Sequence, residues 1–587
     1  MKKRVLASLL VVAMLLSMVA CSSKDEQSTG SKVETTIDEK GNEVVVATPT
    51  PTDVPVEEIT DVDEISVLTN GELVHGKFET TRHITVETFD RDGKTAADDN
   101  MYTDYIKKGM LEKYNVEVEF VAVPRWTEVD QINNLLAAQN APDICYTYSY
   151  PTIQQYANYG GVQDLQEWLT DEYKGLFSNL WNWLGSANIY YDQDPEDGTI
   201  WAIEGRRNNT YRINTFVRQD WLNKLGLEAP TTTAEFEAML VAFRDNAELL
   251  LGDDADKMVP LSVSYDIGWR AANLIESKMD PNITDKELYI NGYDDRKFTE
   301  NGTKEAVRLL NKWYNDGLIW KDFALYPSGD ATEDDMMKAG YVGAFMHNYD
   351  YPFRNGVDSI NAILKATYGD DAAFVAINCF EDSEGNYTKY SYSAAGDRKA
   401  FFPATNDEPL ASMLYLDFIS SPEVVEYLQI GEEGITHTVL EDGAIQTMAA
   451  DDDHVAYTMN SGNNIDLTMT CNGLRLSSTE LTEKSLAYGY AENDPEIVAA
   501  AMAAASLDAR EPKNVNVGEI AAEAEVGSGL SDLRDAAFDK AVVCSVEDFD
   551  KVWDEGMAEY LAAGGQEIID ERTAAWEANY GTATMLP

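Results

Sequence analysis

Aromatic and charged side chains follow several of the segments that the sequence predicts as strands. Trp126 comes directly after the second strand of the folded region, Tyr148 and Tyr150 follow the third, and Trp269 follows a strand over residues 259–263. Aromatic faces stack on apolar C–H surfaces, while carboxylates, arginines and amides bind hydroxyl groups through paired hydrogen bonds. Such residues at the ends of strands could line a binding site for a polar ligand such as a sugar, although a tryptophan such as Trp126 could equally be a lid on the core.

A basic cluster stands out near residue 207. Arg206, Arg207 and Arg212 lie within seven residues of one another in a chain with a net charge of −58. The cluster could bind a uronate, a sulfate or another acidic group. Internal ion pairs with the abundant carboxylates are the alternative, and we favour ion pairs while keeping Arg207 as a candidate ligand contact.

No catalytic motif is present. The sequence has no GxSxG, HExxH, Walker A or GxGxxG pattern. A surface glycoside hydrolase remains the enzyme alternative, and it needs two carboxylates about 5–10 Å apart. With 103 Asp and Glu residues, closeness of two carboxylates in the sequence does not identify such a pair.

The sequence predicts neither a cofactor nor a bound metal. The five histidines form no HExxH motif and no i, i+4 pair. An acidic stretch that begins at Asp192 resembles a calcium loop, but Asp197 and Ala202 occupy the positions where an EF-hand needs Gly and Glu. The cysteines beyond residue 21 lie far apart and form no CxxC, and sequence alone leaves their disulfide state open: Cys145, Cys379, Cys471 and Cys544.

The charge argues against nucleic acids and anionic lipid surfaces as partners. The chain has 587 residues, with 45 Lys and Arg against 103 Asp and Glu. Nucleic acids and anionic lipid surfaces are bound through basic residues, so neither is an expected partner. Apolar residues make up 44% of the chain, which is enough for a sizeable core.

The N-terminus has the features of an export signal with a lipid attachment site. Lys2, Lys3 and Arg4 precede an apolar run over residues 5–19, which is too short for a membrane span. Ser17 to Cys21 resembles a bacterial lipobox, with Met18 where Leu is usual. We therefore expect a lipoprotein signal peptide over residues 1–20, a lipidated Cys21 and a disordered acidic Thr/Pro tether over residues 21–81.

Alternating strands and amphipathic helices begin near Arg82. Residues 83–89 and 116–123 alternate like strands, residues 98–114 and 128–140 read as helices, and residues 142–146 form a third short strand. This order predicts a parallel sheet with right-handed crossovers. Thr232 and Glu235 form a capping box before another helix, and residues 304–316 form a helix that Gly317 ends.

Several separated segments resemble one family, the extracellular solute-binding proteins of ABC importers whose best-known members bind oligosaccharides. Arg218 to Leu227, followed by Pro230 to Thr232, resembles the family pattern R.DWL.KLGL..P.T. Weaker matches lie at residues 142–144, 159–165, 198–203, 313–319, 418–423, 431–435 and 548–565. The order and spacing of these segments carry the resemblance from about residue 82 to residue 580.

The resemblance implies a two-lobed α/β fold of the periplasmic-binding-protein type II class, with ligand in a cleft between lobes hinged by crossing strands. The first lobe would comprise residues 82–212 and about 393–440. The second would comprise residues 213–392 and about 441–587.

The resemblance also implies a function. The chain would be a monomeric receptor, tethered to the outer face of a bacterial cell membrane only by its lipid, that captures an oligosaccharide and delivers it to the transmembrane subunits of an ABC permease. It would not be an enzyme. A peptide-binding receptor is the alternative, although we identify no Asp and Arg pair for the two ends of a peptide.

Further candidate contacts follow from the family's cleft. The loop that starts at Asp90 borders the cleft in the family, and a later strand that ends near residue 348 enters it. Tyr349 and Tyr351 are therefore the strongest candidates. Asp397 or Arg398, where the chain returns to the first lobe, could also contact the ligand. Asp90 could equally be part of a solvated turn.

Overall fold

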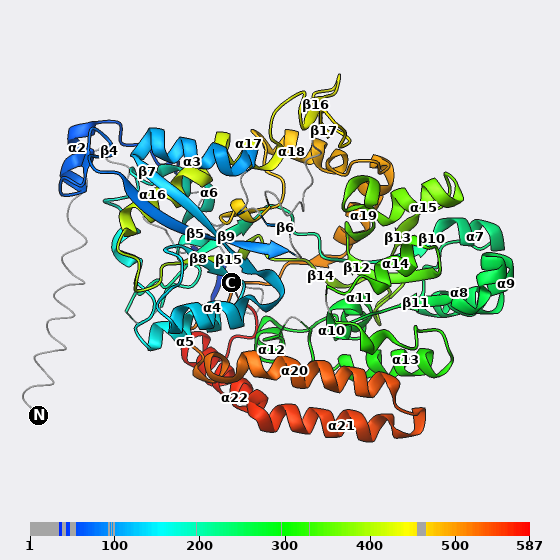
Figure 1. The fold of residues 1–587 in the computed structure, drawn as a ribbon. Helices are drawn as coiled ribbons and strands as arrows, with labels where there is room; N and C mark the ends of the chain where they lie inside the picture. The colour runs from blue at the N-terminus through cyan, green and yellow to red at the C-terminus, as the bar shows by residue number, and fades with distance from the viewer. Residues whose placement is uncertain are drawn as a thin grey trace, which may run out of the picture. The chain divides into compact units, whose positions relative to one another are not determined.

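The computed structural model describes residues 34–37, 43–46 and 54–586, apart from residues 92–93, 96, 98–99, 195–196, 295, 328 and 455–464 (Figure 1). The chain divides into one unit within residues 1–52 and a second within residues 53–586. In the first unit, β1 (Glu34–Ile37) pairs with β2 (Glu43–Val46) as an antiparallel hairpin. The expected signal segment and Cys21 lie outside the described residues.

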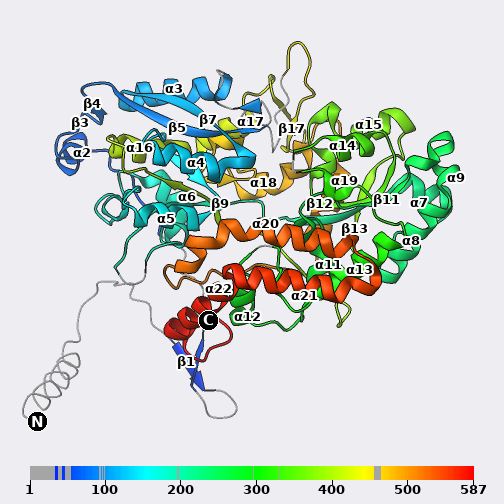
Figure 2. The same ribbon diagram turned by 60° about the horizontal axis from the view of Figure 1, so that its bottom comes forward.

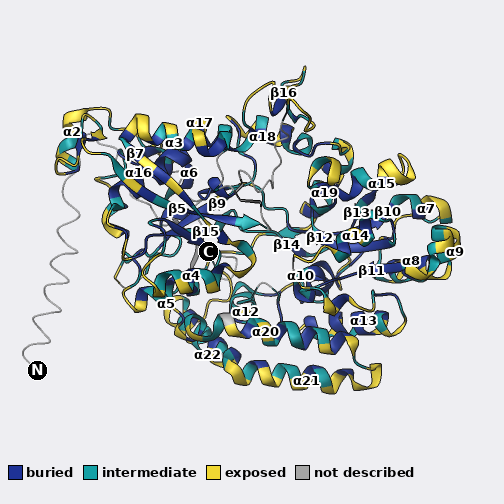
Figure 3. Ribbon diagram, in the orientation of Figure 1, coloured by how far each residue is buried: buried dark blue, intermediate teal, exposed yellow. Residues whose placement is uncertain are grey.

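Two lobes make up the second unit. We call residues 54–207, 395–439 and 465–476 the first lobe, because they pack around one large hydrophobic core and two smaller clusters. Residues 213–390 and 490–586 pack around two other large cores and form the second lobe. Buried residues lie at the centres of both lobes, whereas the outer helices have exposed faces (Figure 3).

The first lobe starts with the predicted alternation of strands and helices. β5 (Arg82–Arg91) pairs in parallel with β7 (Val116–Pro124), and α3 (Met101–Tyr114) connects them. After α4 (Glu128–Ala137) comes β8 (Cys145–Thr147), and a parallel bridge between Val86 and Ile144 ties this segment to β5. The predicted parallel arrangement is confirmed.

A second group of strands extends this layer. β15 (Ala395–Phe401) lies between β8 and β9 (Ile203–Arg207) and runs antiparallel to both. β18 (Cys471–Asn472) pairs in parallel with β9 at the edge of the same sheet. The carboxyl ends of β5, β7 and β9 thus carry their next residues toward one edge of the lobe.

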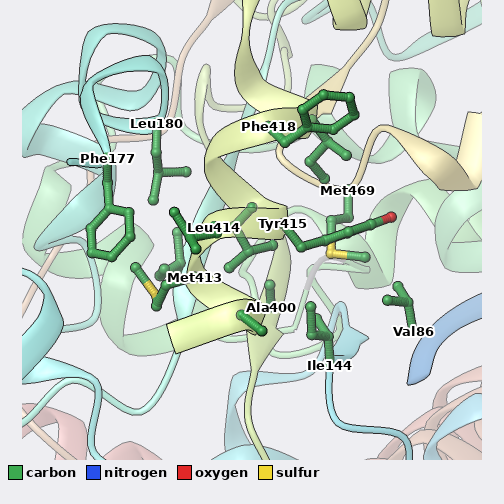
Figure 4. Packing of buried hydrophobic residues seen from close by; sticks show 14 of the residues in the cluster. Val86, Ile144, Phe177, Leu180, Ala400, Met413, Leu414, Tyr415, Phe418 and Met469 are labelled. Atoms are coloured by element: carbon green, nitrogen blue, oxygen red, sulfur yellow. The ribbon is translucent and has the colours of Figure 1, made fainter. Parts of the chain in front are cut away.

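The first core packs on a helix that is apolar on all sides. Met413, Leu414, Tyr415 and Phe418 of α16 (Pro409–Ser420) contact buried residues from the strands and from α6 (Ser178–Ile189), among them Val86 (Figure 4). A helix that is hydrophobic all round belongs in an interior, which explains its burial. Two further helices complete this lobe, α5 (Tyr150–Asn158) and α17 (Pro422–Ile430).

The folded region begins earlier than the sequence predicted. Residues 54–81 were expected to be part of the tether, but α2 (Val62–Leu68), β3 (Leu73–Val74) and β4 (Lys77–Phe78) are ordered against the first core. Ile65, Leu73 and Phe78 are buried there. Val56, Ile59 and Leu68 also pack against this core, so the segment buries enough apolar surface to offset its ordering.

The second lobe is built on a mixed sheet in the order β11–β12–β10–β13. β10 (Ile213–Arg218) is antiparallel to β12 (Val342–Asn348) and β13 (Phe374–Ile377), and β11 (Val259–Ser262) is parallel to β12. Neighbouring residues of β10 and β12 enter two different cores, with Val217 and Met346 in one and Phe216 and Phe345 in the other.

Helices cover both faces of this sheet. The predicted capping box forms at the start of α8 (Thr233–Asp245), where Thr232 Oγ1 accepts a 3.2 Å hydrogen bond from the Glu235 amide. The predicted helix before Gly317 is α13 (Thr303–Asn315). Further helices are α7 (Gln219–Leu225), α9 (Ala247–Leu251), α10 (Ile267–Arg270), α11 (Ala272–Ser277), α12 (Asp285–Asn291), α14 (Thr332–Lys338), α15 (Ile360–Tyr368) and α19 (Pro495–Ser506).

The C-terminal part of the chain departs from the expected division into lobes. Residues 441–587 were assigned to the second lobe, but Leu467, Met469 and Cys471 pack in the first core, because β18 completes the first-lobe sheet. The last helices, α20 (Ala521–Val543), α21 (Phe549–Tyr560) and α22 (Gln566–Tyr580), do pack on the second lobe (Figure 2). The start of α20 also contacts α5 of the first lobe.

In the part of the chain that the structure describes, three segments cross between the lobes. Residues 208–212 join β9 to β10, residues 391–394 join β14 (Lys389–Tyr390) to β15, and the chain leaves β18 to reach α19. Three narrow connections between two separately packed cores permit one lobe to move against the other. No helix in the described part of the chain is long and apolar enough to cross a membrane.

Candidate functional site

A cavity of about 810 Å³ lies between the two lobes. The first lobe contributes the last residues of β5 and β9, residues that follow β7 and β8, and residues of β15 and β18. The second lobe contributes the end of β12 and the residues after β11. Tyr211 and Tyr392 of the crossing segments line it as well. The cavity therefore forms where strand ends from both sheets meet, as expected for an α/β fold.

Arginines dominate the first-lobe wall. Arg91, Arg125, Arg207 and Arg398 line the cavity there. Arg91 binds Asp466 through two hydrogen bonds of 2.7 and 3.0 Å, and Arg125 Nη1 binds Glu128 at 2.6 Å.

Arg207 is held in a similar way. Its Nη2 pairs with Asp397, and its guanidinium lies 3.9 Å from the ring centroid of Tyr392. Its partner carboxylate is 1% exposed, and that of Arg91, Asp466, is 0% exposed. The carboxylates thus lie behind the arginines and orient them, while the guanidiniums face the cavity.

These ion pairs keep the arginines charged. Burial alone would lower the pKa of Arg91, but the charge and hydrogen bonds of Asp466 raise it above its ordinary value. The same balance, with Asp397 as the partner, raises the pKa of Arg207. Both side chains are permanent cations at any physiological pH.

The second-lobe wall combines carboxylates with arginines. Asp266, Asp330, Glu333, Asp334 and Asp350 line it together with Arg296 and Arg354. Asp266 accepts 3.0 and 2.5 Å bonds from Nε and Nη2 of Arg296, and Asp350 accepts a 2.7 Å bond from Arg354. This wall can accept hydrogen bonds from hydroxyl groups as well as donate them.

A stacked pair of rings lies at the end of β12. The rings of His347 and Tyr351 are 3.5 Å apart between centroids and 19° from parallel. Tyr351 donates a 2.8 Å hydrogen bond to Asp334, and the Tyr265 hydroxyl oxygen lies 3.1 Å from His347 Nε2. Burial and the nearby Arg270 and Arg354 charges hold the pKa of His347 well below its ordinary value, so its imidazole is neutral.

Aromatic surfaces are present on both walls. The Trp126 side chain, at the first-lobe rim, is 50% exposed. Arg212 and Arg296 lie 4.8 and 5.4 Å from the Trp269 ring centroid, so guanidinium groups already pack on that ring. Trp126 is consequently the larger accessible surface for a ligand to stack on.

Six of the nine side chains proposed from the sequence line the cavity: Trp126, Tyr148, Arg207, Trp269, Tyr349 and Tyr351. Contact of any of these side chains with a ligand stays a prediction. Tyr349 is almost buried, and its hydroxyl is engaged by Asn209 and by Tyr490.

Asp90, Tyr150 and Asp397 do not line the cavity. Asp90 pairs with Thr95 of β6 (Lys94–Thr95), and the following residue, Arg91, reaches the cavity. Tyr150 lies in the first turn of α5 because β8 ends at Thr147, and its hydroxyl donates to the Asp192 carbonyl at 3.0 Å. Asp397 lies underneath Arg207 and acts through it.

Several residues that line the cavity were not predicted from the sequence. Arg125 and Arg354 each lie in or beside a 3-10 turn at the end of a strand, where no local pattern marks a site. Arg296 reaches the cavity from the loop after α12 and Asn472 from β18, both far away in the sequence. Only a general signal could have found Arg125, namely an arginine next to a tryptophan directly after a strand.

The arrangement suits binding of a polar ligand with many hydroxyl groups. Its arginines form ion pairs, with carboxylates behind the wall in the first lobe and with carboxylates of the wall itself in the second lobe, and aromatic rings border them. Among the described residues, no group of three or more His, Cys, Asp and Glu side chains is placed to hold a metal ion. Cys145, Cys379, Cys471 and Cys544 are free thiols.

No family model matches this chain. The chain is 23% identical over 485 residues, 79% of its length and 86% of the relative, to the polygalacturonan/rhamnogalacturonan-binding protein YtcQ of Bacillus subtilis strain 168. It is 26% identical over 242 residues to lipoprotein LipO of the same strain, an alignment that covers 40% of this chain and 45% of the relative.

Solved structures share the fold. The alginate-binding protein AlgQ2 matches with a TM-score of 0.59 and 15% identity. The match covers 89% of this chain and 100% of that chain. The ABC-transporter substrate-binding protein FusA of S. pneumoniae, in complex with kestose, matches with a TM-score of 0.59 and 12% identity, covering 86% and 100%. The expected two-lobed α/β fold class is confirmed, and the proteins that share it here are binding proteins.

Proposed function

We propose that this chain, which has the fold of the substrate-binding proteins of ABC transporters, captures an oligosaccharide outside the cell and delivers it to a permease. It performs no reaction. Its work is to bind the ligand and to present a closed, ligand-bound form to its partner.

The cavity between the lobes carries this proposal. Its volume of about 810 Å³ lies in the range of ligand sites. It combines an accessible tryptophan at the rim with arginines, carboxylates and tyrosine hydroxyls from both walls. This mixture matches a sugar chain, which offers apolar C–H faces and hydroxyl edges at the same time.

Closure follows from the connections between the lobes. A ligand that contacts both walls binds the closed form more tightly than the open form. The ratio of these two affinities sets how far the ligand shifts the equilibrium toward the closed form. The three crossing segments form the hinge. The permease would then recognise a surface made of both lobes in the closed form.

The relatives support transport of carbohydrate without deciding its charge. YtcQ is named for binding polygalacturonan and AlgQ2 for alginate, whereas FusA is bound to kestose, a neutral sugar. LipO is named a lipoprotein, which supports attachment of this chain to the outer face of the membrane through Cys21. We propose a monomer that meets the transmembrane subunits of an ABC permease.

Thermal unfolding in the presence of candidate ligands tests the function. The chain from residue 54 onward, measured with neutral oligosaccharides, uronic-acid oligosaccharides and short peptides, should be stabilised by at least one of the glycan classes. At a concentration 100 times the dissociation constant, a ligand that binds only the folded state stabilises it by about 2.7 kcal/mol.

Two results would contradict the proposal. Stabilisation by peptides alone would keep the fold and remove the carbohydrate ligand. Hydrolysis of a stabilising glycan during incubation, followed by chromatography of the products, would show an enzyme instead of a receptor.

A further inference from the structure

The two walls of the cavity differ in charge. On the first-lobe wall four arginines line the cavity and, among the described residues, no carboxylate does. On the second-lobe wall five carboxylates line it with two arginines. This division is unexpected in a chain with 103 acidic and 45 basic residues, because acidic side chains predominate by more than two to one.

Three of the first-lobe arginines are held by one edge only. Arg91 uses Nε and Nη2 for Asp466, Arg125 uses Nη1 for Glu128, and Arg207 uses Nη2 for Asp397. Within the described residues, the other terminal amino group of each, Nη1 of Arg91 and Arg207 and Nη2 of Arg125, has no protein partner and is not buried. Each guanidinium thus keeps N–H donors that can reach a ligand.

These three arginines come from separate elements. Arg91 ends β5, Arg125 starts the 3-10 turn after β7, and Arg207 ends β9. Their carboxylate partners lie behind them, where they fix the orientation of each guanidinium without reaching the cavity. Oriented guanidiniums with donors directed at the cavity can bind carboxylates through charge-assisted hydrogen bonds.

We propose that the oligosaccharide is carboxylated, a chain containing uronic acid residues, and that it binds with its carboxylates against Arg91, Arg125 and Arg207. Its hydroxyl edge faces the carboxylates of the second lobe, which accept hydrogen bonds from hydroxyls but repel an anion. The ligand therefore has a fixed orientation in the cavity. This inference rests on the proposed function and adds the charge and the direction of the ligand.

The long-range field of the protein opposes such a ligand. A net charge of −58 repels anions at a distance, so the local arginines must supply the attraction. At physiological salt the distant charges are screened beyond about 8 Å, while contacts inside the cavity are screened much less. The affinity measured at this ionic strength therefore depends on contacts with the local arginines more than on the distant charges.

Calorimetric titration with matched sugars tests the ligand charge. The probes are oligogalacturonates and oligoalginates of two to four residues, each paired with its carboxyl-reduced neutral counterpart, at 150 mM salt. Charge-assisted hydrogen bonds predict that an acidic probe binds about 10- to 100-fold more tightly than its neutral counterpart.

Two neighbouring arginines supply the variant and its control. Arg207→Gln removes a cavity guanidinium, whereas Arg206→Gln removes the same charge one residue away, from an exposed side chain that packs on Trp183 outside the cavity. Arg207→Gln should lose about 10-fold or more in affinity for the acidic probe and little for the neutral one. Arg206→Gln should retain the affinities of the unaltered chain for both.

A second variant keeps the test valid if Arg207→Gln unfolds. Arg125→Gln leaves Glu128 with hydrogen bonds from Thr147 and from the Tyr148 amide, and it should show the same selective loss. Equal affinity for acidic and neutral probes, or equal losses in the two neighbouring variants, would overturn the inference while leaving a carbohydrate receptor. Absence of binding by every sugar, neutral or acidic, would overturn the proposed function itself.

Discussion

Replacing Arg270 with methionine should lower the free energy of unfolding by about 3–5 kcal/mol. Arg270 is fully buried behind the second-lobe wall, and it binds Glu333 through hydrogen bonds of 2.7 and 2.8 Å. It also donates to the Met346 carbonyl at 2.5 Å, which fixes the end of β12. Without Arg270, a nearly buried carboxylate loses its counter-charge, and unfolding in urea followed by circular dichroism measures the cost.

A double variant separates this cause from simple loss of packing. Arg270→Met combined with Glu333→Leu removes both charges, and replacing a buried ion pair by apolar residues is often neutral. The double variant should therefore recover most of the lost stability. If it is as unstable as Arg270→Met alone, packing or the bond to Met346, rather than the unpaired carboxylate, sets the cost.

Replacing Trp126 with alanine should weaken oligosaccharide binding by about 2 kcal/mol, or about 30-fold in Kd. The side chain is half exposed at the rim of the cavity, where a sugar ring can cover it. Stability should change little, because little of the indole is packed in a core. Titration with the glycan that gives the largest thermal shift measures the effect.

Tyr159 provides the matched control for Trp126. It is an 81% exposed aromatic residue at the end of α5 in the same lobe, and it does not line the cavity. Tyr159→Ala should leave the affinity unchanged. A Trp126→Ala variant that binds as tightly as Tyr159→Ala would exclude stacking on Trp126.

Local patterns predicted the framework because they act over a few residues. The alternation before residue 146 and the Thr232 capping box both depend on neighbours in the sequence, and both appear in the structure. Alternation stops being informative where a strand stops. Tyr148 reaches the cavity, but Tyr150, two residues later, does not, because α5 has already begun.

The site itself depends on contacts between remote segments. Arg91 acquires its orientation from Asp466, and Asn472 lines the cavity because β18 joins β9. Neither relation leaves a signal in the local sequence. The basic cluster at residues 206–212 shows the same limit, since Arg206 is exposed, Arg207 faces the cavity and Arg212 is buried against Glu276 at 2.5 Å.

The crystal structure of the chain with its strongest stabilising oligosaccharide would test the central claim most directly. We expect sugar density between the lobes that contacts Trp126 and at least one first-lobe arginine together with residues at the end of β12. Density at any other place on the molecule, with the cavity between the lobes empty, would contradict it.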